Sequence, residues 1–380
     1  MKRISILLLL YFLIPQFANA QVEYVEVGSE ILNQRREIKI QLPRNYESSE
    51  KSYPVIVVLD GDYMFEPFAG NVDYLSYWEI IPEAFVVGIN QVGYREEDGF
   101  LSEDELPISS GADFFEFIGY EVLKFMDDNY RTSPFAVIAG IDLMANYSNF
   151  YLLKENPLFR GYISLSPDLT PLMPSRIQNK VSKIEQKIWY YLATGEDDIP
   201  VLKKEIEQLD ELLAKVENPN FTYQFDVFDK ASHFSLVANA IPDALNTIFK
   251  VYRPISDNEY QDELLKSENP VVYLEDKYFL ISELYAIEIP IRVTDFLMVA
   301  DAIEENENWE AYKDLSRLAK KESPETVLST YFEGRYYQEI GKPKKAIKAY
   351  QGGYGLKSAG YLNSDTLLEK ADELKRIFGY

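Results

Sequence analysis

The sequence contains no cysteine, a single histidine, and only 38 basic residues against 62 acidic ones. Without cysteine no disulfide can cross-link the fold, so its stability has to come from a packed core, for which 22 Phe and 29 Tyr supply material. The single histidine, His233, excludes a metal site built from several histidines. We find no EF-hand-like loop, so the acidic surplus indicates a solvated surface rather than Ca²⁺ ligands, and no cofactor is expected. The formal net charge of −24 makes binding to nucleic acid or an anionic membrane unfavourable.

The first 20 residues have the pattern of a secretory signal peptide. Lys2-Arg3 precedes an apolar run from Ile4 to Ile14, and Ala18-Asn19-Ala20 has the small-x-small form of a signal-peptidase site. The apolar run is too short to cross a membrane, and no cysteine follows it to accept a lipid. We therefore expect an exported mature chain that starts near Gln21, has no transmembrane segment, and is periplasmic, associated with the outer membrane, or secreted.

Segments typical of strands alternate with segments typical of helices from Val22 to about Phe249. Pro54 to Asp60 and Ala84 to Asn90 are apolar up to their last residue, as in strands that are buried on both faces of a parallel sheet. Asp113 to Asn129 instead has its apolar residues at helical spacing. This alternation predicts an α/β fold with a doubly wound, mostly parallel sheet. Further strands are expected at Val22–Val27, Arg36–Leu42, Gly161–Ser166, Lys187–Ala193 and Phe221–Phe228.

The composition turns polar near Arg253 to Ser267, and the remaining chain is helical in pattern. One stretch has the residue spacing of a tetratricopeptide repeat, with matches at Gly334, Tyr337, Gly341, Ala346 and Tyr350. A degenerate repeat around Ala300 and Tyr312 precedes it, and a capping helix is expected at Ser364–Phe378. We therefore predict a signal peptide at 1–20, an α/β domain at 21–256 and a helical, tetratricopeptide-like domain at 257–380.

A single helical repeat cannot bury its apolar face alone. The helical domain should therefore pack either on the α/β domain or on a protein partner, and we expect it to offer the surface for such a partner.

The segment from Pro134 to Tyr151 predicts a strand, a tight turn and a helix. The apolar run before Gly140 is too short for a helix, and aromatic residues recur at helical spacing after it. In a nucleophile elbow, Gly-x-Ser-x-Gly, such a turn lifts the nucleophile above the sheet. Here the first glycine is present, but Asp142 stands in the nucleophile position and Met144 in that of the second glycine.

These motifs together resemble the Putative esterase family of α/β-hydrolases, which includes enterochelin and S-formylglutathione esterases, and especially its exported bacterial members with a tetratricopeptide tail. The resemblance covers most of the mature chain and implies an α/β-hydrolase fold. Its most specific pieces are Val55–Asp62 with the following Phe68-Ala69-Gly70, Ile81–Ile89, Asn129–Pro134, Ser164–Pro167 and Ser232–Ser235.

The resemblance implies a Ser nucleophile, a His base, and an acid that orients the His. Carried over to this chain, the base is His233, and the acid is one of three consecutive residues, Glu196, Asp197 and Asp198. The oxyanion-hole donors would be the Leu143 N–H and the backbone near Gly61 or Asp62. The nucleophile position is Asp142, where the pattern departs from the family, and no metal is implied.

Three interpretations of Asp142 remain open. Asp is the nucleophile in haloalkane dehalogenases and epoxide hydrolases, which share this fold, but Met144 places a long side chain where a small residue lets the strand and the helix approach. A displaced nucleophile would be Ser148, Ser164 or Ser166, none of which follows an elbow. In the third interpretation, the scaffold no longer catalyses and is kept for binding.

The acidic segment after Arg95 favours the third interpretation. The acidic residues at 96–98 follow Arg95 where family members have a different segment, and added negative charge would hinder an anionic transition state. Instead of acting as a catalytic base, His233 could have a structural role by forming an ion pair with Asp142. The acidic residues at 196–198 could likewise have a structural role, because the helix macrodipole favours negative charge at a helix N-terminus.

We therefore predict an exported, non-catalytic binding or scaffolding subunit of the cell envelope. The alternative is a carboxylic-ester or related hydrolase that uses Asp142 or another nucleophile with His233.

Overall fold

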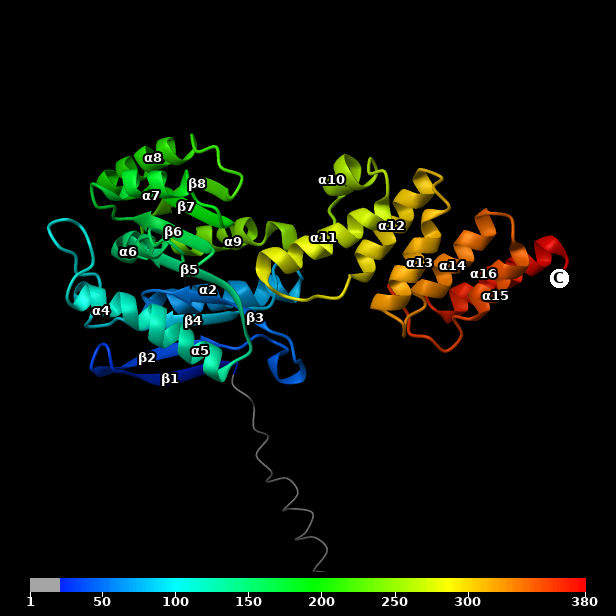
Figure 1. Cartoon of the computed structure of the whole chain (residues 1–380), viewed down its shortest axis with the longest axis horizontal. Coiled ribbons are helices and arrows are strands. Elements are labelled where there is room, and N and C mark those ends of the chain that lie inside the picture. The colour runs from blue at the N-terminus through cyan, green and yellow to red at the C-terminus, as the bar shows by residue number, and fades with distance from the viewer. Residues whose placement is uncertain (1–20) are drawn as a thin grey trace, which may run out of the picture.

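The computed structural model describes residues 21–380, so the predicted signal peptide lies outside the described residues. A single sheet flanked by helices forms the first part of the chain, and stacked helices form the second (Figure 1). The strand order is β1-β2-β4-β3-β5-β6-β7-β8. The strands are β1 (Val22–Ser29), β2 (Gln34–Gln41), β3 (Tyr53–Val58), β4 (Phe85–Ile89), β5 (Thr132–Ile141), β6 (Gly161–Pro167), β7 (Ile188–Asp197) and β8 (Phe221–Ser232).

The sheet is mostly parallel, as the alternation of strands and helices predicted. β1 pairs with β2, and β2 with β4, in antiparallel fashion, whereas all pairs among β4, β3 and β5 to β8 are parallel. The six residues of β3 are all buried and point alternately to the two faces of the sheet. This burial on both faces explains why the parallel strands appear in the sequence as continuous apolar runs.

Two hydrophobic cores lie on the two faces of the sheet. One face is covered by a continuous helical stretch consisting of α4 (Ser110–Glu116), the π-helical turn η3 (Phe117–Val122) and α5 (Leu123–Asn129), and by α6 (Asp142–Leu152), α7 (Met173–Val181) and α8 (Pro200–Leu213). The other face is covered by α2 (Gly61–Tyr77), α9 (Leu236–Ile248) and part of α11 (Pro270–Tyr285). The short helix α3 (Arg95–Asp98) follows β4.

The C-terminal helices form a third core. Gly334 lies where α14 (Leu328–Glu339) meets α15 (Pro343–Gln351), and a Cβ atom there would overlap the Tyr350 ring, so this contact requires glycine. The pairing agrees with a helical repeat, while its assignment as a tetratricopeptide repeat stays a prediction. The elements are α10 (Asp257–Glu259), α11, α12 (Val293–Glu305), α13 (Ala311–Glu322), α14 (Leu328–Glu339), α15 (Pro343–Gln351) and α16 (Ser364–Phe378).

Helix α11 belongs to two cores at once. Its N-terminal and central residues Leu274 and Tyr278 belong to the core of the C-terminal helices. Its C-terminal residues Ile281 and Tyr285 belong to the core on one face of the sheet, where the Tyr285 hydroxyl donates to the Ile248 carbonyl at 2.9 Å. The helical part therefore packs on the sheet through α11, and the domain boundary at 256/257, which stays a prediction, precedes this shared helix.

Within residues 21–380, none of the helices combines the length and the apolar character that a membrane span requires.

Candidate active site

The predicted elbow connects β5 to α6. Asp142 is the first residue of α6 and has a φ of +55°, in the left-handed region that non-glycine residues rarely adopt. A Cβ atom on Gly140 would lie 2.7 Å from the Met144 backbone, so only glycine permits so close an approach of the helix to the strand. The backbone thus keeps the geometry of a nucleophile elbow, although the residue at its apex is an aspartate.

Met144 does not hold the elbow open. Its side chain is fully buried in the core beneath α6, and its sulfur accepts a hydrogen bond from Gln91 Nε2 at 3.4 Å. The expectation that Met144 keeps the strand and the helix apart is therefore wrong, because the side chain leaves the turn towards the core. The close approach depends on Gly140 instead.

Arg95 connects the elbow to the loop after β3. Its Nε and Nη2 atoms donate to the two carboxylate oxygens of Asp60 at 2.8 and 3.1 Å, and Nη2 also donates to Asp142 Oδ2 at 3.3 Å. Asp60 is only 1% exposed, whereas the Asp142 and Arg95 side chains are each 31% exposed. Within residues 21–380, no ion pair joins Asp142 to His233, so the hypothesised pair between them is replaced by one with Arg95.

The charges around Arg95 are not balanced. Burial raises the pKa of Asp60, and the hydrogen bonds from Arg95 offset only part of that effect. Burial and the nearby Asp142 carboxylate raise the pKa of Asp168 as well. The single guanidinium of Arg95 therefore pairs with two carboxylates, and the carboxylate of Asp168 lies nearby. The site thus has an excess of negative charge.

The acidic residues after Arg95 do not converge on Asp142. Asp98 is buried and accepts two hydrogen bonds from Arg36, at 2.9 and 2.6 Å, and one from Gln91 at 3.0 Å. Glu96 and Glu97 are exposed. The expectation that this segment adds negative charge beside Asp142 is wrong for Asp98, which is paired with Arg36, and Arg95 supplies a positive charge there instead.

His233 follows β8 directly and contacts two side chains through one ring nitrogen. Nδ1 lies 3.0 Å from Asp198 Oδ1 and 2.9 Å from Ser166 Oγ. Within the described residues no hydrogen bond to Nε2 is found, so this nitrogen is left for a group in the site. The arrangement is that of a histidine oriented by an acid.

Asp198 is the one of the three candidate acids that meets His233. Its Oδ2 accepts from the Thr194 hydroxyl at 2.7 Å, and its Oδ1 accepts from the Ile199 N–H at 2.8 Å. Burial raises the pKa of Asp198, but the hydrogen bonds from Thr194, Ser166 and Ile199 outweigh burial and hold the pKa below its usual value. The carboxylate is thus kept ionised beside the imidazole.

Glu196 and Asp197, the other two candidates, have exposed side chains. The contact between Glu196 and His233 that the sequence allowed is not formed, because β7 turns these side chains outward. The Glu196 carbonyl instead accepts a hydrogen bond from Lys203 Nζ at 3.0 Å.

The candidate oxyanion-hole residues lie on the first turns of two helices. Leu143 follows Asp142 at the start of α6, and Gly61 opens α2, where an added Cβ would lie 2.6 Å from the backbone of β4. The Asp62 carboxylate accepts from the N–H groups of Gln91 and Val92 at 2.7 and 3.0 Å, which fixes the loop after β4. Helix N-termini present free N–H groups, and the role of these groups as oxyanion donors stays a prediction.

The three serines considered as displaced nucleophiles are all buried. Ser148 donates to the Ala145 carbonyl within α6, and Ser164 Oγ has no hydrogen-bond partner among the described residues. Ser166 alone reaches His233, but it is 0% exposed and bonds the same Nδ1 atom as Asp198. None of the three is therefore presented to a substrate. No group of three or more His, Cys, Asp or Glu residues in the described part of the chain is arranged to hold a metal ion.

Comparisons with known proteins agree with this geometry. A family model described as Putative esterase matches residues 29–334. An uncharacterised protein from Capnocytophaga ochracea is similar to this chain with 26% identity and a TM-score of 0.83, over 94% of this chain and 100% of that one. An IroE-like serine hydrolase from Shewanella oneidensis is similar with 19% identity and a TM-score of 0.61, over 79% and 99%.

The siderophore hydrolase EstB from Aspergillus nidulans has 14% identity and a TM-score of 0.50, over 62% of this chain and 96% of that one. No curated protein matches the sequence. The likeness to the first two structures confirms the expected α/β-hydrolase fold with a helical C-terminal region.

Proposed function

The chain belongs to the Putative esterase family of α/β-hydrolases, and we propose that it is a non-catalytic member of this family, exported to the cell envelope, where it binds or scaffolds another molecule. The observation that carries the proposal is the pairing of Asp142 with Arg95 at 3.3 Å. The residue at the apex of the elbow is engaged by a cation rather than by the histidine base.

An aspartate in this position suits ester cleavage poorly. Attack of a carboxylate on an ester carbonyl would expel the alkoxide and leave an acid anhydride, which is less stable than the ester. A hydroxyl activated by histidine, in contrast, forms a new ester of similar energy. The guanidinium of Arg95 further stabilises the Asp142 charge and so reduces its nucleophilicity.

The test is hydrolysis of short-chain nitrophenyl esters by the purified mature chain. We expect the rate to equal that of the Asp142→Asn variant, which removes the charge but keeps the size of the side chain. The His233→Ala variant should also show the same background rate. Turnover that disappears in both variants would overturn the proposal.

The second candidate is a hydrolase that uses Asp142 as a nucleophile and His233 as the base that activates water. Two observations favour it: the left-handed φ of +55° at Asp142 and the 3.0 Å contact between His233 and Asp198. In this chemistry the Asp142 carboxylate attacks an alkyl carbon and displaces a leaving group, and water then cleaves the resulting ester. Release of halide or of a diol from haloalkane or epoxide probes would support this candidate over the first.

The proposed partner contact lies on the C-terminal helices. Their core is already closed by α11 and by contacts between successive helices from α13 to α16, so a partner would bind their outer surface. Pull-down with the full mature chain from native envelope fractions tests this idea. The control is a variant of the mature chain in which Tyr354 and Tyr361 are both changed to Ser. These two tyrosines of the C-terminal helical part are 78% and 65% exposed.

A further inference from the structure

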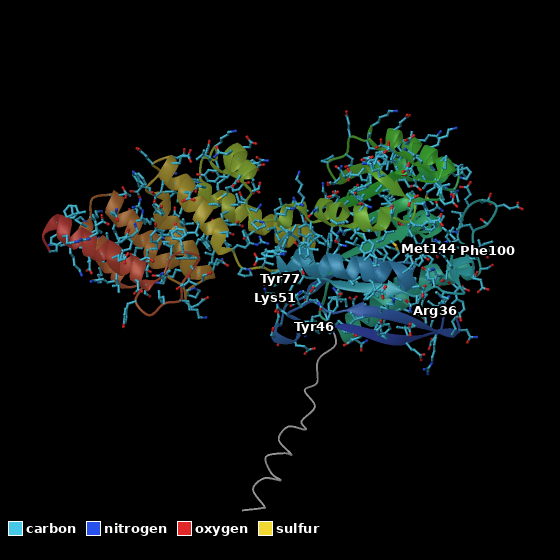
Figure 2. All side chains as sticks on the ribbon, turned by 180° about the vertical axis from the view of Figure 1, so that it is seen from behind. Arg36, Tyr46, Lys51, Tyr77, Phe100 and Met144 are labelled. Carbon is cyan, nitrogen blue, oxygen red and sulfur yellow. The ribbon has the colours of Figure 1, made fainter. Side chains whose placement is uncertain are left out.

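We propose that a second site, a cavity at the junction between the sheet and the C-terminal helices, binds a small zwitterion with an apolar body, such as a free aliphatic amino acid. This inference is independent of the proposed function, because the cavity does not include the elbow. Figure 2 shows Lys51 and Tyr77 at the end of the sheet that faces the C-terminal helices, whereas Met144 lies farther from them.

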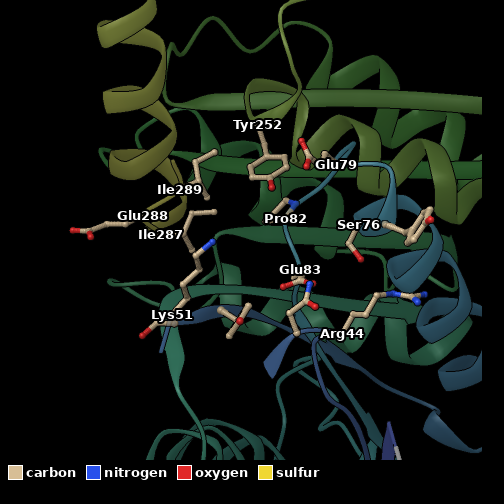
Figure 3. A pocket seen from close by; sticks show the side chains of 14 residues that line it. Arg44, Lys51, Ser76, Glu79, Pro82, Glu83, Tyr252, Ile287, Glu288 and Ile289 are labelled. Atoms are coloured by element: carbon tan, nitrogen blue, oxygen red, sulfur yellow. The ribbon is translucent and has the colours of Figure 1, made fainter. Parts of the chain in front are cut away.

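The cavity has a volume of about 420 Å³, within the range typical of small-molecule sites. It lies at the amino ends of β3 and β4, the opposite edge from the elbow, which follows the carboxyl end of β5. Residues from several separate segments line it, among them Lys51, Tyr53, Pro82, Glu83, Tyr252 and Ile287 (Figure 3). Because these segments belong to both parts of the molecule, the cavity exists only when α11 is docked on the sheet.

The cavity presents charges of both signs that are not paired with each other. Within residues 21–380 no ion pair is found for Lys51, Glu83 or Glu288, and Glu83 only accepts a hydrogen bond from Asn45 at 2.7 Å. The other charged lining residues have partners outside the lining: Arg44 pairs with Asp73, and Glu79 with Arg292 at 3.0 Å. Figure 3 shows the Glu288 carboxylate pointing away from the cavity, so the Lys51 ammonium and the Glu83 carboxylate remain for a ligand.

Two buried tyrosines, Tyr53 and Tyr252, add hydroxyl groups to the charged and apolar residues that line the cavity. Tyr53 is 3% exposed, and its hydroxyl is buried without a hydrogen-bond partner among the described residues. Such a group costs free energy unless something satisfies it. The Tyr252 side chain, which is 8% exposed, directs its hydroxyl into the cavity (Figure 3). A ligand carboxylate could accept hydrogen bonds from Tyr252 and Lys51.

The arrangement of the aromatic rings argues against a sugar. Sugars pack their C–H faces on open aromatic faces, but Arg292 covers the ring of Tyr252, with its guanidinium carbon 4.4 Å from the ring centroid. Arg44 likewise lies over Tyr77, at 5.1 Å. A purely anionic ligand would meet Glu83, and a purely cationic one would meet Lys51. A zwitterion satisfies both signs, and its aliphatic body can pack on Pro82, Ile287 and Ile289.

Isothermal titration of the full mature chain with L-leucine tests the proposal. Two analogues keep the apolar body and lose one charge each: 4-methylpentanoate lacks the ammonium, and 3-methylbutylamine lacks the carboxylate. We expect saturable binding of one leucine per chain and at least a tenfold weaker affinity for each analogue, because each leaves a charged group of the site unpaired. Trehalose should not bind.

Variants in the cavity complete the test. Lys51→Met and Glu83→Gln should each weaken leucine binding at least tenfold, while the matched changes Lys183→Met and Glu185→Gln, which lie outside the cavity, should leave it unchanged. Because all four positions are exposed or half-buried, thermal melting should show all variants folded. Absence of saturable leucine binding, equal affinity for either analogue, or binding that survives both cavity variants would overturn the proposal.

Discussion

Arg95 Nη2 lies 3.3 Å from Asp142 Oδ2, at the apex of an elbow whose backbone is otherwise that of a hydrolase. The same guanidinium binds the buried Asp60. The side chain at the apex is thus an ion-paired carboxylate, while the backbone of the turn has the geometry of a nucleophile elbow. The predictions that follow separate the contributions of the ion pair, the turn and the C-terminal helices.

Replacement of Arg95 by Met should destabilise the fold in a pH-dependent manner. It leaves the Asp60 carboxylate buried without a counter-charge, at a cost of about 3 kcal/mol at neutral pH. The pKa of Asp60 is already raised by burial and should rise further. A carboxyl whose pKa is higher in the folded state destabilises the fold above that pKa, and the penalty disappears as the pH falls below the unfolded value of about 3.9.

Urea unfolding at a series of pH values measures this effect. The difference between wild type and Arg95→Met should shrink from neutral to acidic pH. The double variant Arg95→Met/Asp60→Asn should recover most of the stability and show little pH dependence in that difference. A penalty independent of pH would mean that lost packing of Arg95, and not the unpaired carboxylate, is responsible.

Asp142→Ser alone should create weak esterase activity. The turn already has the required φ of +55°, and His233 is already oriented by Asp198, so only the hydroxyl is missing. We expect nitrophenyl-ester hydrolysis roughly 10²-fold above the Asp142→Asn background, which is well below the full effect of a triad. The activity should be lost in Asp142→Ser/His233→Ala; equal activity in that double variant would exclude His233 as the base.

The tightness of the elbow should depend on Gly140. Gly140→Ala places a methyl group 2.7 Å from the Met144 backbone, so we expect a loss of about 1–3 kcal/mol in the free energy of unfolding. Gly70→Ala is the matched control, since a Cβ there meets nothing within 4 Å. Met144→Ala should also destabilise, by about 2–5 kcal/mol, because it leaves a cavity in the core, yet it should not improve the activity of Asp142→Ser.

The sheet and the position of the elbow could be predicted because both depend on residues that are close together in the sequence. Buried parallel strands require apolar runs such as Val55–Val58, and the turn requires Gly140 at a fixed distance from the apex. The partner of Asp142 could not be predicted, because Arg95 lies 47 positions away and the packing of α3 decides which carboxylates it reaches. Similarly, only the path of β7 determines which of three consecutive acids faces His233.

Met144 illustrates a different limit. The pattern correctly placed it in the position of the second glycine, but the direction of its side chain depends on how α6 leaves the turn. The backbone there carries the side chain into the core rather than against the strand.

Two tyrosines of the predicted repeat should differ in their contribution to stability. Tyr350 is fully buried and packs on Gly334, so Tyr350→Ala should cost about 3–5 kcal/mol. Tyr337 is only partly buried, and Tyr337→Ala should cost clearly less, although both positions match the repeat pattern. Chemical denaturation of the two variants, with Tyr354→Ala as the exposed control, measures the difference; equal losses would contradict the packing described here.

Removal of residues 257–380 should weaken the part that remains. The deletion takes away Ile281 and Tyr285 of the core on this face of the sheet, where the Tyr285 ring packs on Phe135 of β5 and on Phe249 at the end of α9. We expect a lower melting temperature and aggregation through the uncovered apolar face. Tyr285→Ala in the full-length chain isolates the contact and should cost about 3–5 kcal/mol. A shortened chain that melts at the wild-type temperature without aggregating would show that α11 contributes nothing to the sheet.

The double membership of α11 also has a mechanical consequence. The helix contacts β5, the strand that ends at the elbow. A force applied to the C-terminal helices would therefore reach β5 through a helix that is packed in both cores. A domain joined to the sheet by a flexible linker alone would not transmit such a force to β5.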